Sequence, residues 1–230
     1  DSIEASLLRQ FVFNRIKKSG NSSALMFLAQ YVLGLDSENL SKSKAIEAAV
    51  SLDTLKFRDR EKLAEWDWMT VVRNPYIRIL SAYLDKSAAG QGGMRIYKNV
   101  PGFDRTDRYG FERFVNYVAS SGLNDNGHWS LQSSQLYRNA ERYNYIIKLE
   151  NFQLEFGDFL RDKCITSEPK VFGQAHDNDE RTAGRILSGA SSRLHDFYSP
   201  NVFELVKNVY DSDFQQFNYS TNWEHLYEIH

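Results

Sequence analysis

The 230-residue sequence contains one cysteine and four prolines, and its charges nearly balance at a formal net charge of -2. The lone thiol of Cys164 cannot form an internal disulfide, which excludes a secreted scaffold held by disulfides and removes thiolate metal sites. The small net charge gives no bulk attraction to nucleic acid. No apolar run approaches the roughly 20 residues that cross a bilayer. We therefore expect a protein of the reducing cytoplasm with no nucleic-acid partner, transmembrane segment or bound metal.

The chain also lacks internal repeats and any linker rich in Pro, Gly or Ser, so we expect a single domain over residues 1–230. Patterns typical of strands alternate with patterns typical of helices. The strands are predicted at Gln10–Ile16, Met69–Val72 and Tyr143–Leu149, and the helices at Ser22–Leu35, Ser43–Leu55, Phe111–Ser120, Phe152–Asp162, from Pro75 onward, and from Pro200 to Tyr210. This order predicts an α/β fold whose small, mainly parallel central sheet is flanked by helices.

The segment Trp68–Lys86 carries the clearest functional signal. Its apolar run stops at Arg73, and a helical pattern begins directly after Asn74 and Pro75. Asn is a good N-cap and Pro fits the first helical position, so a strand, a tight turn and a helix follow in order. A fixed cation beside the amides of a helix N-terminus is typical of an anion site.

A second strand–loop–helix pattern precedes it, with the loop Lys17–Ser23 between Phe13 and an apolar helix. Gly20 permits a tight turn, and serines near a helix start can donate to phosphate oxygens. Lysine precedes the glycine here, so this is not a Walker A loop, and the serines could serve only as a helix cap. Two such patterns at the carboxyl edge of one sheet favour a nucleotide with phosphates at two separate positions.

Both loops resemble motifs of one family. Residues 18–23 resemble the 5′-phosphosulfate loop of sulfotransferases that use 3′-phosphoadenosine-5′-phosphosulfate (PAPS), and Arg73–Tyr83 resembles the 3′-phosphate motif of the carbohydrate sulfotransferase (type 2) family. Further similar stretches are His128-Trp129 with Gln132, Tyr145–Glu150, and Asp211–Tyr219. The resemblance implies a P-loop-NTPase-like three-layer domain that transfers a sulfuryl group from PAPS to a hydroxyl and releases 3′-phosphoadenosine-5′-phosphate (PAP).

Tyr137 stands where animal members often have cysteine. This departure argues against an animal Golgi-lumen enzyme and implies a bacterial-type member.

The resemblance assigns roles to individual residues. Lys18 would stabilise the charge that develops on the oxygen bridging sulfur and phosphorus, which makes it a catalytic candidate. The residues expected to bind the donor are Lys18, Ser19, Gly20, Asn21, Ser22 and Ser23 at its 5′ end, with Arg73, Ser81, Asn178 and Arg181 at its 3′-phosphate. Ser81 could instead be a buried structural serine, and Arg78 and Arg181 could be surface arginines.

His128 is the candidate general base, because an imidazole can accept a hydroxyl proton near neutral pH. The alternative is that His128 only orders its turn-rich loop. The segment Lys86–Tyr109 interleaves cations with aromatic residues, which suits a carbohydrate or glycoconjugate acceptor but is also typical of a soluble surface segment.

Two rival functions remain at this point. One is a nucleoside or small-molecule kinase, which would need a Walker A lysine and a carboxylate for magnesium. The other is a non-catalytic nucleotide-binding protein.

Overall fold

The computed structural model describes residues 2–6, 11–32, 50–51, 63, 65–87, 97–165 and 189–222. Contacts divide the chain into two compact units. The first unit comprises Asp1–Val72 and Leu136–Thr182, and the second comprises Arg73–Gln135 and Ala183–His230.

The first unit is built on a five-stranded sheet with the strand order β3-β1-β2-β4-β5. Its strands are β1 (Ser2–Ser6), β2 (Phe11–Arg15), β3 (Val50–Ser51), β4 (Asp67–Val72) and β5 (Tyr145–Lys148). Strands β2, β4 and β5 run parallel, while β1 pairs antiparallel with both β2 and β3. The predicted α/β fold with a small, mainly parallel sheet is therefore confirmed.

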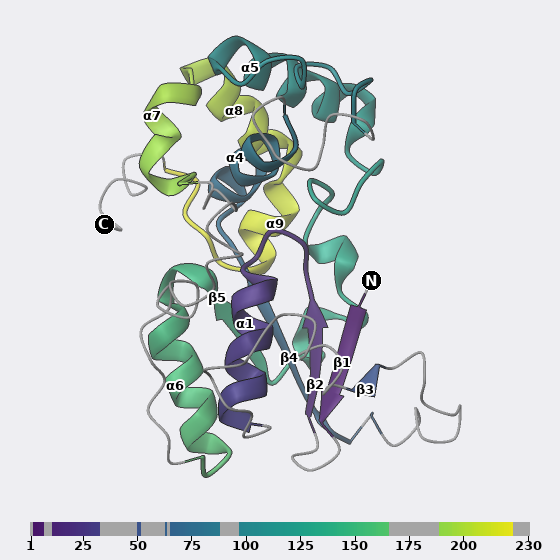
Figure 1. The fold of residues 1–230 in the computed structure, drawn as a ribbon, viewed down its shortest axis with the longest axis vertical. Coiled ribbons are helices and arrows are strands. Elements are labelled where there is room, and N and C mark those ends of the chain that lie inside the picture. The colour runs from purple at the N-terminus through teal and green to yellow at the C-terminus, as the bar shows by residue number, and fades with distance from the viewer. Residues whose placement is uncertain are drawn as a thin grey trace. The chain divides into compact units, whose positions relative to one another are not determined.

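Helices α1 (Asn21–Phe27) and α6 (Phe152–Asp162) lie over one face of this sheet (Figure 1). Alternate strand residues point to opposite faces, so Phe11 and Phe13 pack under these helices while Val12 packs on the other side with Trp68. A π-helical turn extends α1 over Leu28–Val32. Short 3-10 turns at Ala140–Arg142 and Leu149–Asn151 precede β5 and α6, respectively.

The sequence predictions for this unit were correct at the strands and wrong at one helix. Helix Phe152–Asp162 has the predicted bounds, and the predicted strand Gln10–Ile16 contains β2. The helix predicted at Ser43–Leu55 is contradicted at Val50–Ser51, which pair with β1, and its other residues lie outside the described ones. A two-residue strand is defined by its distant partner, so local periodicity cannot reveal it.

The second unit is helical. Its elements are α4 (Pro75–Lys86), α5 (Arg108–Tyr117) with a π-helical turn Val118–Gly122, α7 (Leu194–Phe197), α8 (Pro200–Val209), α9 (Asp211–Gln216) and 3-10 turns at Ser133–Gln135 and Ser191–Arg193. Helix α4 packs against α5, α7 and α8 and buries residues on nearly its whole circumference (Figure 1). The predicted caps are confirmed: Asn74 Oδ1 accepts from the Tyr76 amide at 3.0 Å, and Ser199 Oγ accepts from the Val202 amide at 3.3 Å.

Tyr83 on α4 fixes the loop that enters α5. Its hydroxyl lies within hydrogen-bond distance of the carbonyl oxygens of Gly102, Arg105 and Asp107, at 3.3, 2.7 and 3.1 Å. Burial raises the pKa of the Tyr83 phenol to about 12. The protonated phenol, which can donate to these carbonyls, is thus the form that the fold favours.

Candidate functional site

The loop after β2 has an unusual backbone. Lys18 and Gly20 both adopt left-handed conformations, with φ of 68° and 71°. A Cβ on Gly20 would lie 2.4 Å from Leu149 Cδ1, immediately after β5. Glycine is therefore required at position 20 by both φ and space, while Lys18 holds its conformation at some conformational cost.

The side chains of this loop form a donor set that suits an anion. Ser19 and Ser23 are buried, and Lys18 and Ser22 are half-buried. Gly20 is the N-cap of α1 and no side chain caps it, so the serines do not serve as the cap that the sequence alone allowed. Asn21 Oδ1 is buried with no hydrogen-bond partner in the described part of the chain. Rotation of this amide would present Nδ2 instead, a donor suited to a phosphate oxygen.

Arg73, where the chain leaves β4, is held through its backbone by Gln132. The Arg73 amide donates to Gln132 Oε1 at 2.9 Å, and Gln132 Nε2 donates to the Arg73 carbonyl at 2.8 Å. Gln132 is fully buried. The Gln132 side-chain amide thus binds both the backbone N–H and the backbone carbonyl of Arg73, whose side chain is half-buried.

A buried carboxylate on α9 fixes Gln132 in turn. Asp213 accepts from the backbone amides of Gln132 and Ser133, at 2.8 and 2.9 Å. Its relative exposure is 0%, so these charge-assisted hydrogen bonds offset the desolvation cost of burying the carboxylate. Sequence reasoning placed Gln132 and Asp213 only within similar stretches and missed this role, because no local pattern marks a contact between residues so far apart in the chain.

Arg78 also supports this loop. It is 1% exposed, and its guanidinium donates to the carbonyls of Ser130 and Gly127 at 2.7 and 3.0 Å. The surface-arginine alternative is therefore wrong. Burial lowers the pKa of Arg78, while Tyr210 and Asp213 favour its charged form.

The loop of residues 126–135 is held from further sides. The Tyr210 hydroxyl donates to the Trp129 carbonyl, and Gln135 Nε2 donates to the Gly127 carbonyl at 2.9 Å. The Trp129 ring is buried in the core of the second unit, and its Nε1 donates to the Gly122 carbonyl at 2.8 Å. These contacts give His128 a fixed support.

His128 itself is half-buried. Its Nδ1 lies 2.6 Å from Asn126 Oδ1, which also accepts from the His128 backbone amide at 3.0 Å. The Tyr97 ring packs edge-on to the imidazole, with centroids 6.5 Å apart, and Lys86 Nζ lies 5.8 Å from the Tyr97 ring centre.

The predicted site residues fall in both units. Residues 18–23 belong to the first unit, whereas Arg73, Ser81 and His128 belong to the second. Gln132 connects the loop of His128 to Arg73, and Ser81 is buried on α4. Asn178 and Arg181 lie outside the described residues.

Within the described ranges no cluster of His, Cys, Asp or Glu could hold a metal. None of the helices described is long and apolar enough to span a membrane.

The structure corrects part of the predicted acceptor segment Lys86–Tyr109. Phe103 is buried among Tyr83, Phe114 and Trp129, so its ring is part of the core. Arg108 and Tyr109 form the start of α5. Of the three aromatic residues, Tyr97 and Tyr109 keep exposed surface for a ligand.

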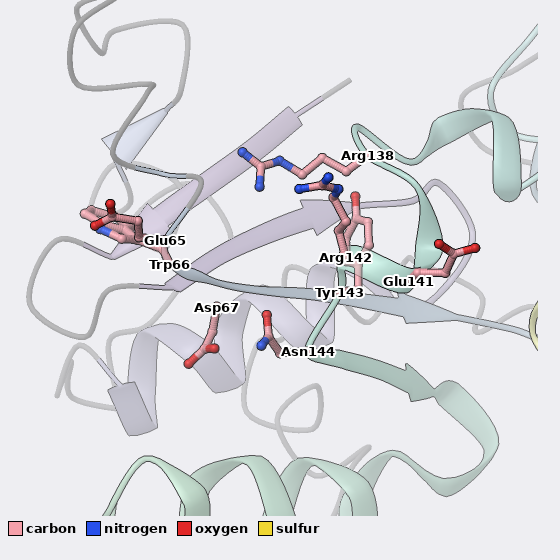
Figure 2. Close-up of a pocket in the computed structure, with 8 residues that line it drawn as sticks. All are labelled: Glu65, Trp66, Asp67, Arg138, Glu141, Arg142, Tyr143 and Asn144. Atoms are coloured by element: carbon pink, nitrogen blue, oxygen red, sulfur yellow. The ribbon is translucent and has the colours of Figure 1, made fainter.

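A cavity of about 280 Å³ opens in the first unit, and none of the predicted site residues lines it. It is lined by Glu65, Trp66, Asp67, Arg138, Glu141, Arg142, Tyr143 and Asn144. Figure 2 shows the guanidinium groups of Arg138 and Arg142 side by side, with the Glu141 carboxylate directed away. Because three carboxylates and two guanidiniums line the cavity, its charge selects neither an anion nor a cation.

Comparison with known families identifies the class of protein. The model of the sulfotransferase family matches residues 8–220, and the chain belongs to this family. Searches of curated proteins and of solved structures gave no match. The chain is therefore a PAPS-dependent sulfotransferase that produces PAP. Both rival functions, the kinase and the non-catalytic nucleotide-binding protein, are set aside by this result.

Proposed function

We propose that this sulfotransferase transfers the sulfuryl group of PAPS to a hydroxyl of a carbohydrate or glycoconjugate, with His128 as the general base. The observation that carries this proposal is the pairing of Gln132 with both backbone groups of Arg73. It ties the residue assigned to the donor's 3′-phosphate to the loop that carries the base. Reacting groups held at a fixed separation remove much of the entropic barrier to reaction.

The residues present fit the donor. Gly20 lets the backbone of the loop make its left-handed turn before α1, and Asn21 carries a buried polar atom with no partner among the described residues. We assign residues 18–23 to the 5′-phosphosulfate, and Arg73 and Ser81 to the 3′-phosphate. When bound, the donor supplies a sulfuryl group whose departure leaves negative charge on the bridging oxygen. The Lys18 ammonium stabilises that charge, an effect worth about 100- to 1,000-fold in kcat for a well-placed donor.

His128 accepts the proton of the acceptor hydroxyl as the new oxygen–sulfur bond forms. General base catalysis of this kind contributes about 100- to 10,000-fold. The half-buried position of His128 suits this role, because the ring keeps exposed surface while its loop is held by Arg78 and Tyr210.

A carbohydrate acceptor is supported by the surroundings of His128. Tyr97 offers an aromatic ring next to the imidazole, and Lys86 adds a cation beside that ring. Apolar faces of sugars stack on aromatic rings, and hydroxyl, carboxylate or sulfate groups accept from lysine.

We also propose that the two units act as one sulfotransferase domain. The family model spans both units, and each unit holds only part of the residues assigned to the donor. Urea denaturation of the whole chain should then show one cooperative unfolding transition, and two separate transitions would contradict the proposal.

The test is a screen of glycan and small-alcohol acceptors with labelled PAPS, followed by kinetics of variants on the best acceptor. Lys86→Ala should raise the acceptor KM and leave PAPS affinity unchanged. Lys207→Ala is the matched control, because Lys207 lies on α8 and pairs with Glu204. It should change neither the acceptor KM nor the PAPS affinity. Transfer only to non-carbohydrate hydroxyls, or a His128→Ala variant with full activity, would refute the proposal.

A further inference from the structure

We infer that Asn126 is a positioning residue for the reaction: it holds the His128 imidazole with its hydrogen on Nδ1 and its proton-accepting lone pair on Nε2. This inference rests on the proposed role of His128 as the base. It adds a residue that neither the family match nor the sequence motifs single out.

The orientation of the Asn126 amide follows from a backbone contact. The His128 backbone N–H lies 3.0 Å from the atom assigned as Asn126 Oδ1. A backbone N–H can only donate, so this atom must be the oxygen. The other end of the amide agrees, since Nδ2 donates to the Tyr97 hydroxyl at 3.3 Å.

The tautomer of His128 follows from the amide. His128 Nδ1 lies 2.6 Å from the same Asn126 oxygen. An amide oxygen only accepts hydrogen bonds, so the hydrogen of this short contact must sit on Nδ1. A neutral imidazole protonated on Nδ1 carries its lone pair on Nε2, and Nε2 is therefore the atom that can take the acceptor proton.

The surrounding structure restrains the Asn126–His128 pair. Arg78 and Tyr210 bind the carbonyls of Gly127 and Trp129, on either side of His128. The Tyr97 ring packs edge-on to the imidazole, and the Tyr97 hydroxyl accepts from Asn126 Nδ2, so rotation of either partner would break a contact.

Charged and titratable groups near His128 come from several segments of the second unit. The Arg78 guanidinium donates to the Gly127 carbonyl, next to His128. The Lys86 ammonium lies beside the Tyr97 ring and pairs with the Asp85 carboxylate at 2.9 Å. Asp125, three residues before His128 in the chain, accepts a hydrogen bond from the Tyr117 hydroxyl. The Tyr97 phenol, whose ring packs against the imidazole, is a further titratable group near His128.

This arrangement suits a base that must take up a proton and release it again. As the acceptor oxygen bonds to sulfur, its proton passes to Nε2, and the electron pair of the breaking sulfur–oxygen bond leaves with PAP. The hydrogen on Nδ1 stays where it is, held by the neutral Asn126 amide. A carboxylate at position 126 would instead stabilise the imidazolium and raise the pKa of the base.

The test combines NMR of the imidazole nitrogens with pH profiles of kcat/KM. The wild-type protein should show Nδ1–H His128 in its neutral form. Asn126→Asp, which keeps the acceptor oxygen and nearly the same shape, should raise the His128 pKa by about 1 unit or more and move the acidic limb of the profile to higher pH by the same amount. In Asn126→Ala the hydrogen of neutral His128 should no longer be confined to Nδ1, and kcat should fall by about 10- to 100-fold.

Asn116→Asp is the matched control, since Asn116 is exposed on α5 and its side chain donates to the Glu112 carbonyl. It should alter neither the His128 spectrum nor the pH profile. Neutral His128 protonated on Nε2, or an Asn126→Asp variant with unchanged pKa and acidic limb, would overturn the inference. The NMR measurement on the wild-type protein needs no turnover, so it tests the orientation of His128 by Asn126 separately from the role of His128 as the base. If the wild type shows the Nδ1–H signal but His128→Ala is fully active, the proposed base is refuted while the orientation by Asn126 is supported.

Discussion

Asp213→Asn should strongly destabilise the second unit, although the side chain hardly changes in size. The carboxylate accepts from two backbone amides, those of Gln132 and Ser133, at 2.8 and 2.9 Å in a fully buried position. An asparagine has one oxygen, so one of these amides would face the Nδ2 group, another donor. Losing one charge-assisted hydrogen bond and leaving a buried N–H unpaired costs about 2–5 kcal/mol. That is a large share of the roughly 5–15 kcal/mol that stabilises a typical domain.

The assay is urea denaturation followed by tryptophan fluorescence, since buried Trp129 lies in the same loop. Asp211→Asn is the control: Asp211 begins the same helix, is exposed, and accepts from Gln215 Nε2. It should change the free energy of unfolding by less than about 1 kcal/mol. If the two variants unfold within about 1 kcal/mol of each other, Asp213 does not hold the loop and the reasoning is refuted.

Three further predictions concern the donor loop and α4. Lys18→Ala should lower kcat by about 100-fold or more with a much smaller change in PAP affinity; loss of affinity alone would contradict its leaving-group role. Gly20→Ala should destabilise the fold. Adding Leu149→Ala should restore the stability lost to the 2.4 Å contact but not the stability lost to the left-handed φ at position 20. A denaturation midpoint that recovers fully in the double variant would show that φ imposes no strain. Because burial raises the pKa of Tyr83 from 10.0 to about 12, the fold favours the neutral phenol, and this stability is present below pH 10 and lost as pH rises toward 12. The free energy of unfolding of Tyr83→Phe should therefore fall less steeply over this range, and an equal slope would argue against the burial effect.

Local signals account for what the sequence predicted well. Asn74-Pro75 and Ser199-Pro200 mark helix starts because capping and the fixed φ of proline act within a few residues, and both caps are present. The buried strand β4 likewise reads as an apolar run. The cap at Asn74 and the apolar run of β4 together located Arg73 between a strand and a helix.

The features that escaped prediction depend on distant partners. Arg78 looks like a surface arginine until the carbonyls of Gly127 and Ser130 are placed beside it. The roles of Gln132 and Asp213 arise from residues 59 to 81 positions apart in the chain, and the two-residue strand β3 is defined by its pairing with β1. The acceptor, the localisation, and the roles of Asn178 and Arg181 stay predictions.

The most direct test of the donor assignment is calorimetric titration of the wild-type chain and Arg73→Ala with PAP and with ADP, which lacks the 3′-phosphate. Gln132 contacts only backbone groups of Arg73 in the hydrogen bonds described above, so alanine should preserve the local fold. The wild type should prefer PAP, and Arg73→Ala should lose about 10- to 100-fold of that preference, the equivalent of one or two charge-assisted hydrogen bonds. Equal affinity of the wild type for both nucleotides, or an unchanged preference in Arg73→Ala, would contradict it.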